Sequence, residues 1–255
     1  MVSATSGEFR APAVQRRERL KEVYARAQAC TRCPELAATR RSVVFGSGNA
    51  DADLMFVGEA PGASEDEQGL PFVGQAGKLL ERLLGEIGLS RGDVFIANTL
   101  KCRPPGNRDP LPIEIDNCRE YLFEQVELIE PRVICSLGNF ATKLLRDDPA
   151  GITRVHGQPQ VITLGRRAVR LYPIFHPAAA LYTPRMLQTL REDFARLPDL
   201  LALPPPEPPA AVDQAEQREA DEALAAAAVA VAEAAPTGGP GGSDAAPAPD
   251  QLGLF

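Results

Sequence analysis

Four of the five cysteines in the chain are spaced so that they could converge on one centre. Cys30 and Cys33 form a close pair, and Cys102 and Cys118 follow as two distant single residues. Four thiolates suit either a zinc ion or an iron–sulfur cluster. One close pair with two single cysteines is less specific than two close pairs, so a structural zinc site and a set of unconnected buried thiols stay open as alternatives.

Cys135 does not join this group, because it lies in the apolar run 133–137, which is typical of a buried strand. A lone buried cysteine usually behaves as a small hydrophobic residue. Disulfides are the weaker alternative for the other four thiols, since the first residues show no charged segment, apolar core and cleavage site of a secretory signal.

A second group of chemistry-bearing residues lies in a loop rich in glycine and proline. The apolar run 53–57 leads into Gly58-Glu59-Ala60-Pro61-Gly62, and after an acidic stretch with Glu65 the chain continues as Pro71-Phe72-Val73-Gly74. Ligand loops of open α/β sheets lie at the carboxyl ends of such strands. On its own, the loop could either bind a ligand such as a phosphate or only turn the chain.

Two further polar residues lie where apolar runs end. Asn98 ends the run near 93–99, and His176, one of only two histidines, follows the run near 169–175. An asparagine at a strand end is commonly a turn or cap residue, and a lone histidine is commonly structural. The functional interpretation is favoured for His176 because it shares a rim with the loop and Asn98, whereas His156 is assigned a structural role.

These residues must be positioned by a regular alternation of elements. Strands that alternate with helices imply a parallel sheet covered on both faces. Residues 152–175 are predicted as a hairpin that leads into the last core strand. Strands are predicted at about 53–58, 93–99, 132–137 and 169–175, and helices near 16–29, 75–87, 112–129, 139–146 and 184–197.

Composition indicates one globular domain with an appendage. Of 255 residues, 44% are hydrophobic, and no apolar run is long enough to span a bilayer. Residues 1–200 carry 26 Lys+Arg and 25 Asp+Glu, whereas the rest carry 1 and 9, so the acidity belongs to the tail. A nearly neutral domain can still present a basic face to nucleic acid. We predict a folded domain over 1–202 and a disordered acidic linker, rich in Pro, Ala and Gly, over 203–250.

Several ordered motifs at compatible spacing carry more information than any one of them. They are Gly58-Glu59-Ala60-Pro61-Gly62, Pro71-Phe72-Val73-Gly74, Asn98, Lys101-Cys102-Arg103-Pro104-Pro105, the four cysteines and the run from Ile174 to Leu181. Over about residues 24 to 198, this set resembles a family 4 uracil-DNA glycosylase, the iron–sulfur branch of the uracil-DNA glycosylase superfamily. The resemblance implies a three-layer α/β/α fold with a four-stranded, mainly parallel sheet. It also implies a 4Fe–4S cluster on Cys30, Cys33, Cys102 and Cys118, and hydrolytic excision of uracil from DNA.

The resemblance assigns base recognition to three residues. Phe72 would stack on the flipped base, although an apolar core plug is its alternative role. Ala60 would line the base-binding loop. The side-chain amide of Asn98 offers a donor and an acceptor that could read O4 and N3–H of uracil, and cytosine presents the reversed pattern.

The chemical step is assigned to His176 and two carboxylates. An imidazole N–H of His176 would stabilise the negative charge that builds on uracil O2. Glu59 and Glu65 are both candidates for stabilising the sugar cation or orienting the attacking water, and the sequence does not choose between them. In the better-known uracil glycosylases an aspartate follows the position of Glu59, where this chain has Ala60, so water activation does not transfer from those relatives.

Arg103, Arg108 and Leu181 are the expected contacts with DNA. Scattered arginines are more often solvated surface than a nucleic-acid footprint, so the two arginines alone are a weak signal. Leu181 is expected to enter the duplex as an apolar wedge. Tyr182 stands where many relatives carry an arginine, which leaves the local DNA contact open.

The last five residues form a separate pattern. Gln251, Leu252, Leu254 and Phe255 resemble the bacterial sliding-clamp-binding peptide, in which these residue types recur in this order. A short anchor on a flexible tether suits recruitment to a partner. We therefore expect a monomeric bacterial enzyme of the cytoplasm and nucleoid, with uracil-containing DNA and the replication clamp as partners.

Two other functional classes remain. A catalytically silent DNA-docking relative would keep the fold and the cluster, and a zinc-stabilised interaction protein would have no need of the pocket residues. No lysine is obviously presented for Schiff-base chemistry, so an active enzyme is expected to be monofunctional and to leave an abasic site.

Overall fold

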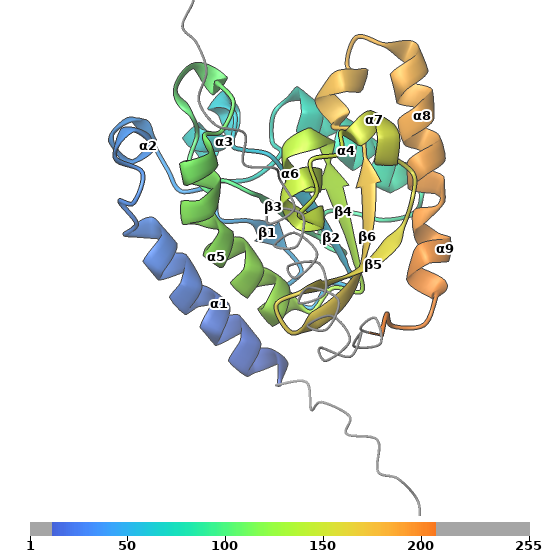
Figure 1. Cartoon of the computed structure of the whole chain (residues 1–255), viewed down its shortest axis with the longest axis horizontal. Coiled ribbons are helices and arrows are strands. Elements are labelled where there is room, and N and C mark those ends of the chain that lie inside the picture. Colours follow the sequence, from blue (N-terminus) through green and yellow to red (C-terminus); the bar gives the residue numbers. More distant parts are fainter. Residues whose placement is uncertain (1–11, 208–255) are drawn as a thin grey trace, which may run out of the picture. The chain divides into compact units, whose positions relative to one another are not determined.

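A mixed sheet of six strands forms the centre of residues 12–207, the part of the chain that this computed structural model describes (Figure 1). The strand order is β1-β3-β2-β4-β6-β5. The predicted clamp motif at 251–255 and the linker beyond residue 207 lie outside the described residues. The strands are β1 (Ser47–Gly48), β2 (Leu54–Gly58), β3 (Phe95–Asn98), β4 (Val133–Leu137), β5 (Gln160–Leu164) and β6 (Arg167–Ile174).

Four of these strands are parallel to one another, and they are the four predicted from the sequence. β2 pairs with β3 and β4, and β4 pairs with β6. β1 and β5 add antiparallel edges that the four-stranded prediction lacks. β1 has only two residues, too few for a periodic pattern. β5 belongs to the predicted hairpin, which turns at Gly165 with φ +61°.

Nine α-helices lie within residues 12–207. The five long helices predicted from the sequence are present as α1, α4, α5, α6 and α8. The sequence does not predict α2, α3, α7 and α9, because four to six residues are too few to show the helical period. No helix in this part of the chain has both the length and the apolar character to cross a bilayer. The helices are α1 (Ala13–Gln28), α2 (Pro34–Thr39), α3 (Ala63–Gln68), α4 (Gln75–Glu86), α5 (Pro112–Ile129), α6 (Gly138–Arg146), α7 (Ile152–Val155), α8 (Pro184–Ala195) and α9 (Leu197–Ala202), with 3-10 turns η1 (Pro105–Asn107) and η2 (Pro177–Ala180).

The sheet separates two apolar cores, so the fold has three layers. Met55 and Val57 of β2 face the first core, which is formed with α1, α5 and α6. Leu54 and Phe56 face the second core, which is formed with α4, α8 and α9. This alternation follows from the pleat of a strand. Figure 1 shows α1 and α5 together on one side of the sheet and α8 and α9 on the other, and the predicted α/β/α class is confirmed.

The carboxyl ends of the four parallel strands lie along one rim of the sheet. Gly58 at the end of β2 pairs with Asn98 at the end of β3, and Leu137 of β4 pairs with Ile174 of β6. Loops that follow parallel strands open at the same rim. The topology therefore brings the loop after β2, the end of β3 and His176 to one place.

Candidate active site

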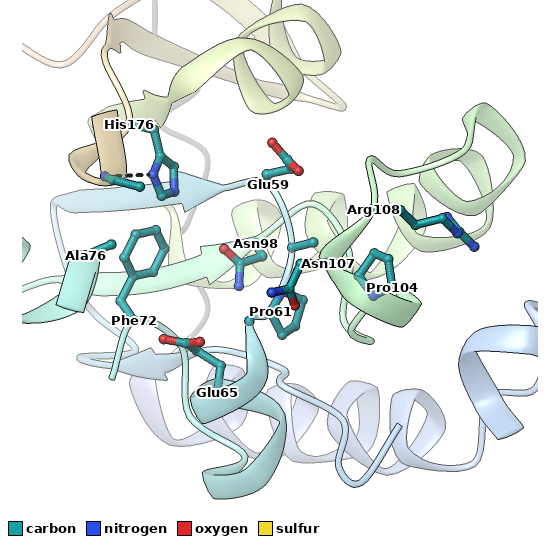
Figure 2. A pocket seen from close by; sticks show the side chains of 13 residues that line it. Glu59, Pro61, Glu65, Phe72, Ala76, Asn98, Pro104, Asn107, Arg108 and His176 are labelled. Atoms are coloured by element: carbon teal, nitrogen blue, oxygen red, sulfur yellow. Dashed lines mark hydrogen bonds between the residues drawn. The ribbon is translucent and has the colours of Figure 1, made fainter. Parts of the chain in front are cut away.

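A cavity of about 300 Å³ opens at this rim (Figure 2). It is large enough to hold a single small ring. The six residues that the sequence assigns to base recognition and chemistry all line it: Glu59, Ala60, Glu65, Phe72, Asn98 and His176.

Asn98 forms the floor of the cavity. Its side chain is 2% exposed, and its Oδ1 is buried without a hydrogen-bond partner among the described residues. A buried acceptor without a partner costs free energy unless a ligand supplies a donor. Gly58 makes room for this group, because a Cβ there would stand 2.4 Å from Asn98 Oδ1 and 2.7 Å from Phe72 Cζ. The site is shaped to receive a flat ligand with an N–H donor.

Phe72 provides an aromatic face opposite His176. The ring centroids lie 5.5 Å apart with an angle of 29° between the planes. Phe72 has φ +53°, in the left-handed region that a bulky residue rarely adopts. Glu65 Oε1 accepts hydrogen bonds from the backbone N–H groups of Val73 and Gly74 at 2.9 and 2.8 Å. Glu65 thus supports the loop that presents the ring.

The imidazole of His176 is neutral at physiological pH. Loss of solvent lowers its pKa to about 4, and the nearby Glu65 carboxylate opposes this shift only in part. His176 caps η2, and its Nδ1 accepts a hydrogen bond from the Ala178 backbone at 3.1 Å. A neutral imidazole that accepts at Nδ1 carries its proton on Nε2. His176 is therefore an uncharged N–H donor.

Glu59 is held by its backbone, and its carboxylate is free. Its carbonyl accepts hydrogen bonds from Thr99 Oγ1 and from Leu100 N, the latter at 3.0 Å. Within residues 12–207 its carboxylate forms no hydrogen bond. Burial raises the pKa of Glu59, and the charge of Asp109 raises it further. A carboxylate with a raised pKa and free oxygens can act as a base toward water.

Comparison of the sequence with known proteins identifies its family. A family model of the uracil DNA glycosylase superfamily matches residues 45–198. The chain belongs to this superfamily. It is 43% identical over 187 residues to the type-4 uracil-DNA glycosylase of Archaeoglobus fulgidus, covering 72% of this chain and 94% of that protein. Over 164 residues it is 46% identical to the type-4 uracil-DNA glycosylase of Thermotoga maritima, covering 64% and 83%. The family predicted from the sequence motifs is confirmed.

In this member of the uracil DNA glycosylase superfamily, the four cysteines lie beside the first core, at one end of α1 and α5. Cys102 and Cys118 are buried, and Cys30 and Cys33 pack against the same core. Burial raises the pKa of Cys118 to about 11, so this thiol keeps its proton at neutral pH unless a metal displaces it. Cys135 is fully buried in the second core and belongs to no such group.

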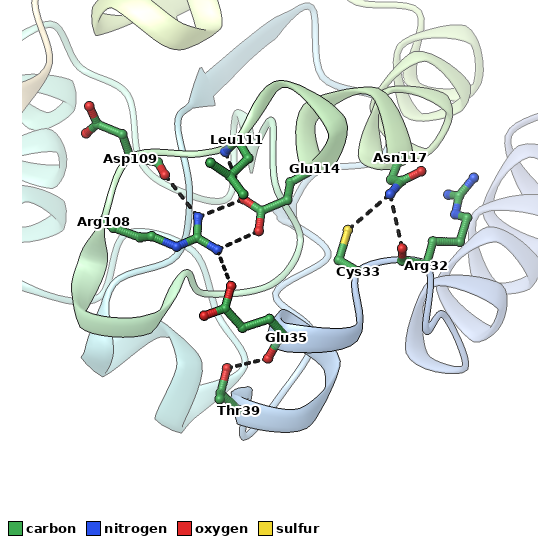
Figure 3. Close-up of polar contacts among 9 residues, drawn as sticks. All are labelled: Arg32, Cys33, Glu35, Thr39, Arg108, Asp109, Leu111, Glu114 and Asn117. Carbon is green, nitrogen blue, oxygen red and sulfur yellow. Dashed lines mark hydrogen bonds and ion pairs between the residues drawn. The ribbon is translucent and has the colours of Figure 1, made fainter.

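Two of the four sulfurs accept a hydrogen bond within the described residues, as is typical of thiolates that bind iron. No three His, Cys, Asp or Glu side chains in residues 12–207 surround a point that could hold a single metal ion. The donors are Arg40 Nη1 to Cys102 Sγ at 3.1 Å and Asn117 Nδ2 to Cys33 Sγ at 3.4 Å (Figure 3), whereas the Tyr121 hydroxyl donates to the Arg26 carbonyl.

Arg108, one of the residues expected at DNA, is occupied by carboxylates (Figure 3). Its Nη1 and Nη2 donate to the two oxygens of Glu114 at 3.0 and 2.7 Å, and Nη2 also donates to Glu35 at 2.7 Å. Although Arg108 lines the cavity, two acidic partners offset its charge. Its evident role is to tie the loop after β3 to α2 and α5.

The other two expected DNA contacts differ in how freely they project. Arg103 Nε donates to Asn107 Oδ1 at 2.8 Å at the cavity mouth. Leu181 is half-buried and packs against the second core. The neighbouring Tyr182 is 90% exposed, so the side chain that projects from this segment is the tyrosine.

Two cations that support the site are not found by sequence reasoning. Lys101 is 2% exposed, and its Nζ donates to the Asn98 carbonyl at 2.9 Å and to Gln125 Oε1 at 2.7 Å. Arg91 binds the backbone beside Phe72. Both act through backbone carbonyls, which leave no pattern in a sequence; only the position of Lys101 beside Cys102 could have pointed to it.

Proposed function

We propose that this chain is a uracil-DNA glycosylase, which flips uracil out of DNA and hydrolyses its N-glycosidic bond. The observation that carries the proposal is the unpartnered buried Oδ1 of Asn98 in a cavity walled by Phe72 and a neutral His176. The type-4 uracil-DNA glycosylases named among the relatives support the same substrate.

Base recognition in this proposal rests on Asn98 and Phe72. The Asn98 Oδ1 accepts from uracil N3–H, and Nδ2 donates to O4. Cytosine has an unprotonated N3 and an amino group at C4, so both contacts become repulsive. Phe72 stacks on the ring after it leaves the duplex, which offsets part of the lost base stacking.

The chemical step breaks the bond between uracil N1 and the sugar C1′. The bonding electrons leave with the base, and charge develops on O2, where the Nε2–H of His176 donates a hydrogen bond. Glu59 stabilises the positive charge on the sugar and orients the attacking water. The water oxygen bonds to C1′, one of its protons passes to the Glu59 carboxylate and on to solvent, and the uracil anion takes up a proton from solvent. Glu59 is preferred to Glu65 here because both hydrogen bonds of Glu65 Oε1 are used by the Phe72 loop. The products are free uracil and an abasic site.

Cys30, Cys33, Cys102 and Cys118 are proposed to hold a 4Fe–4S cluster with a structural role. Four cysteine thiolates are the usual ligands of such a cluster. Two observations suit thiolate ligands: all four cysteines lie at one core, and Cys102 Sγ and Cys33 Sγ accept hydrogen bonds from Arg40 and Asn117. The cluster would tie the N-terminal helices to the loop after Asn98. Iron and sulfide analysis, together with absorbance near 400 nm, separates it from zinc.

A strand-scission assay on oligonucleotides that contain a single uracil tests the activity. We expect alkali-sensitive abasic sites from uracil, and none from thymine; hypoxanthine and xanthine substrates define the range. Borohydride should trap no covalent adduct, because the proposed nucleophile is water. DNA binding without excision would instead support the catalytically silent docking module.

The motif at Gln251, Leu252, Leu254 and Phe255 is proposed to bind the bacterial sliding clamp, on its sequence pattern alone. A 20-residue C-terminal peptide should bind the purified clamp, and Leu254→Ala with Phe255→Ala should abolish binding. Truncation should begin after residue 207, because the carbonyls of Leu203 and Pro204 accept hydrogen bonds from Arg132 and Arg170. The truncated protein should excise uracil from oligonucleotides at the parental rate.

A further inference from the structure

We propose that Arg91 is a positioning residue that holds Phe72 in its stacking conformation. The inference rests on the proposed function, in which the Phe72 ring stacks on the base. Arg91 lies outside the base cavity, in a second groove that also includes Ser47, Leu70 and Glu81. It therefore acts on the reaction only through the loop that it binds.

The guanidinium of Arg91 binds the two backbone carbonyls at Phe72. Nη1 donates to Phe72 O at 2.8 Å, and Nη2 donates to Pro71 O at 2.6 Å. The same group pairs with Glu81 at 3.2 Å, which limits the directions in which it can turn. A planar guanidinium with two parallel donors fixes the direction of both carbonyls, which the single ammonium of a lysine does less well.

Glu65 fixes the other side of Phe72. Its Oε1 accepts from the N–H groups of Val73 and Gly74. Two carbonyls at Phe72 are thus held by a cation, and two N–H groups after it are held by an anion. Four backbone groups around one strained residue are bound by only two side chains, which are 26 positions apart in the chain.

The first turn of α4 packs against the Phe72 loop on a third side. A Cβ at Gly77 would stand 1.8 Å from Phe72 O, so the helix backbone lies directly against this carbonyl. The loop is enclosed by Arg91, Glu65 and α4, and the Phe72 ring is left facing His176 at 5.5 Å. A left-handed phenylalanine persists only where its surroundings hold it, and Arg91 is the part of this enclosure that can be removed without touching the cavity.

A double-mutant cycle tests whether Arg91 acts through Phe72. Arg91→Ala should lower the single-turnover excision rate and weaken free-uracil binding, each by roughly 10- to 100-fold, because small misplacements of a contact group have effects of this size. In a Phe72→Ala background, the further loss from Arg91→Ala should be less than about twofold, since coupled residues are not additive. An equal loss in both backgrounds would overturn the proposal.

Two control variants separate positioning from charge. Arg82→Ala removes an exposed arginine of α4 and should leave rate and binding unchanged. Glu81→Gln removes the acidic partner of Arg91 but keeps both carbonyl contacts, and should change the rate by less than about threefold. Besides these two controls, Arg91→Lys should recover part of the excision rate that is lost in Arg91→Ala. A Glu81→Gln loss as large as that of Arg91→Ala would assign the effect to the ion pair and contradict the proposal.

A conformational readout keeps the test independent of activity. With fluorinated phenylalanine incorporated, the Phe72 resonance is assigned by its loss in Phe72→Leu. Arg91→Ala should shift or broaden this resonance, and Arg82→Ala should not. An unmoved resonance would refute the positioning role even in a fully active enzyme. If Arg91→Ala moves the Phe72 resonance but the wild-type protein does not excise uracil, the proposed function is refuted and the positioning of Phe72 by Arg91 is supported. If Arg91→Ala lowers the melting temperature strongly, Arg91→Lys serves for the same comparison.

Discussion

Asn98 and His176 are the residues on which the proposed chemistry depends most directly. Asn98→Ala removes the amide that is proposed to read the base, and His176→Ala removes the proposed donor to O2. Each should lower the single-turnover excision rate by about 100-fold or more. His156→Gln, which alters the other histidine outside the base cavity, is the matched control and should be close to parental. A variant of either residue with parental excision and intact fold would show that its role is misassigned.

The pH dependence of the rate should follow Glu59 and not His176. The pKa of His176 is about 4, so its imidazole stays neutral from pH 8 down to about pH 5. The pKa of Glu59 is raised by burial, so its carboxylate is protonated first as the pH falls. We expect a pH–rate profile with one acidic limb, and Glu59→Gln should be slower and lose that limb. If the acidic limb of the pH–rate profile persists in Glu59→Gln, a group other than Glu59 causes it.

His176 also makes the free energy of unfolding depend on pH. Its pKa is lower in the folded state than the value of about 6.5 in an unfolded chain. Between these two values the unfolded state binds more protons, so the stability contribution is complete above about pH 6.5 and is lost as the pH falls toward 4. The free energies of unfolding of the wild type and of His176→Gln should be compared at pH 7 and at pH 4.5. The change in their difference between the two pH values gives the contribution of His176.

At the scale of elements, the contact between α4 and the Phe72 loop sets a strict limit on side-chain size. Gly77→Ala would place a Cβ 1.8 Å from Phe72 O, so the helix or the loop must move. We expect a loss of about 1–3 kcal/mol in the free energy of unfolding, together with slower excision. Gly85→Ala in the same helix meets nothing within 4 Å and should stabilise by up to about 1 kcal/mol. Denaturant unfolding measures both, and equal effects would contradict the packing argument.

Long elements and their order were predictable from the sequence, and short supporting elements were not. β2, β3 and β4 are buried throughout and β6 is buried in its second half, and the carboxyl ends of these runs predicted the rim where Asn98 and His176 meet. The sequence could not predict α3, which carries Glu65, because six residues show no period. It also could not predict that Leu181 packs inward while Tyr182 projects, since adjacent residues differ only through tertiary packing.

At the scale of the whole molecule, the four cysteines, as ligands of the proposed cluster, would join parts of the chain that are far apart in sequence. Cys102→Ser should lower the iron content and the melting temperature, because the loop after β3 would lose its link to α1, α2 and α5. Cys135→Ala alters a buried thiol in the other core. It should keep full iron content, although it too loses some stability through the cavity it leaves. Full iron content in Cys102→Ser would exclude Cys102 as a ligand.

The unpartnered Oδ1 of Asn98 has a consequence for turnover. This acceptor has no partner among the described residues, and in the proposed reaction released uracil offers it the same N3–H as the flipped nucleotide does. We therefore expect uracil to leave the pocket slowly after the bond has broken. Rapid-quench kinetics should show a burst equal to the enzyme concentration, followed by a slower steady state that added free uracil slows further. Such kinetics would mean that the enzyme excises its first uracil quickly and is then slowed by its own product.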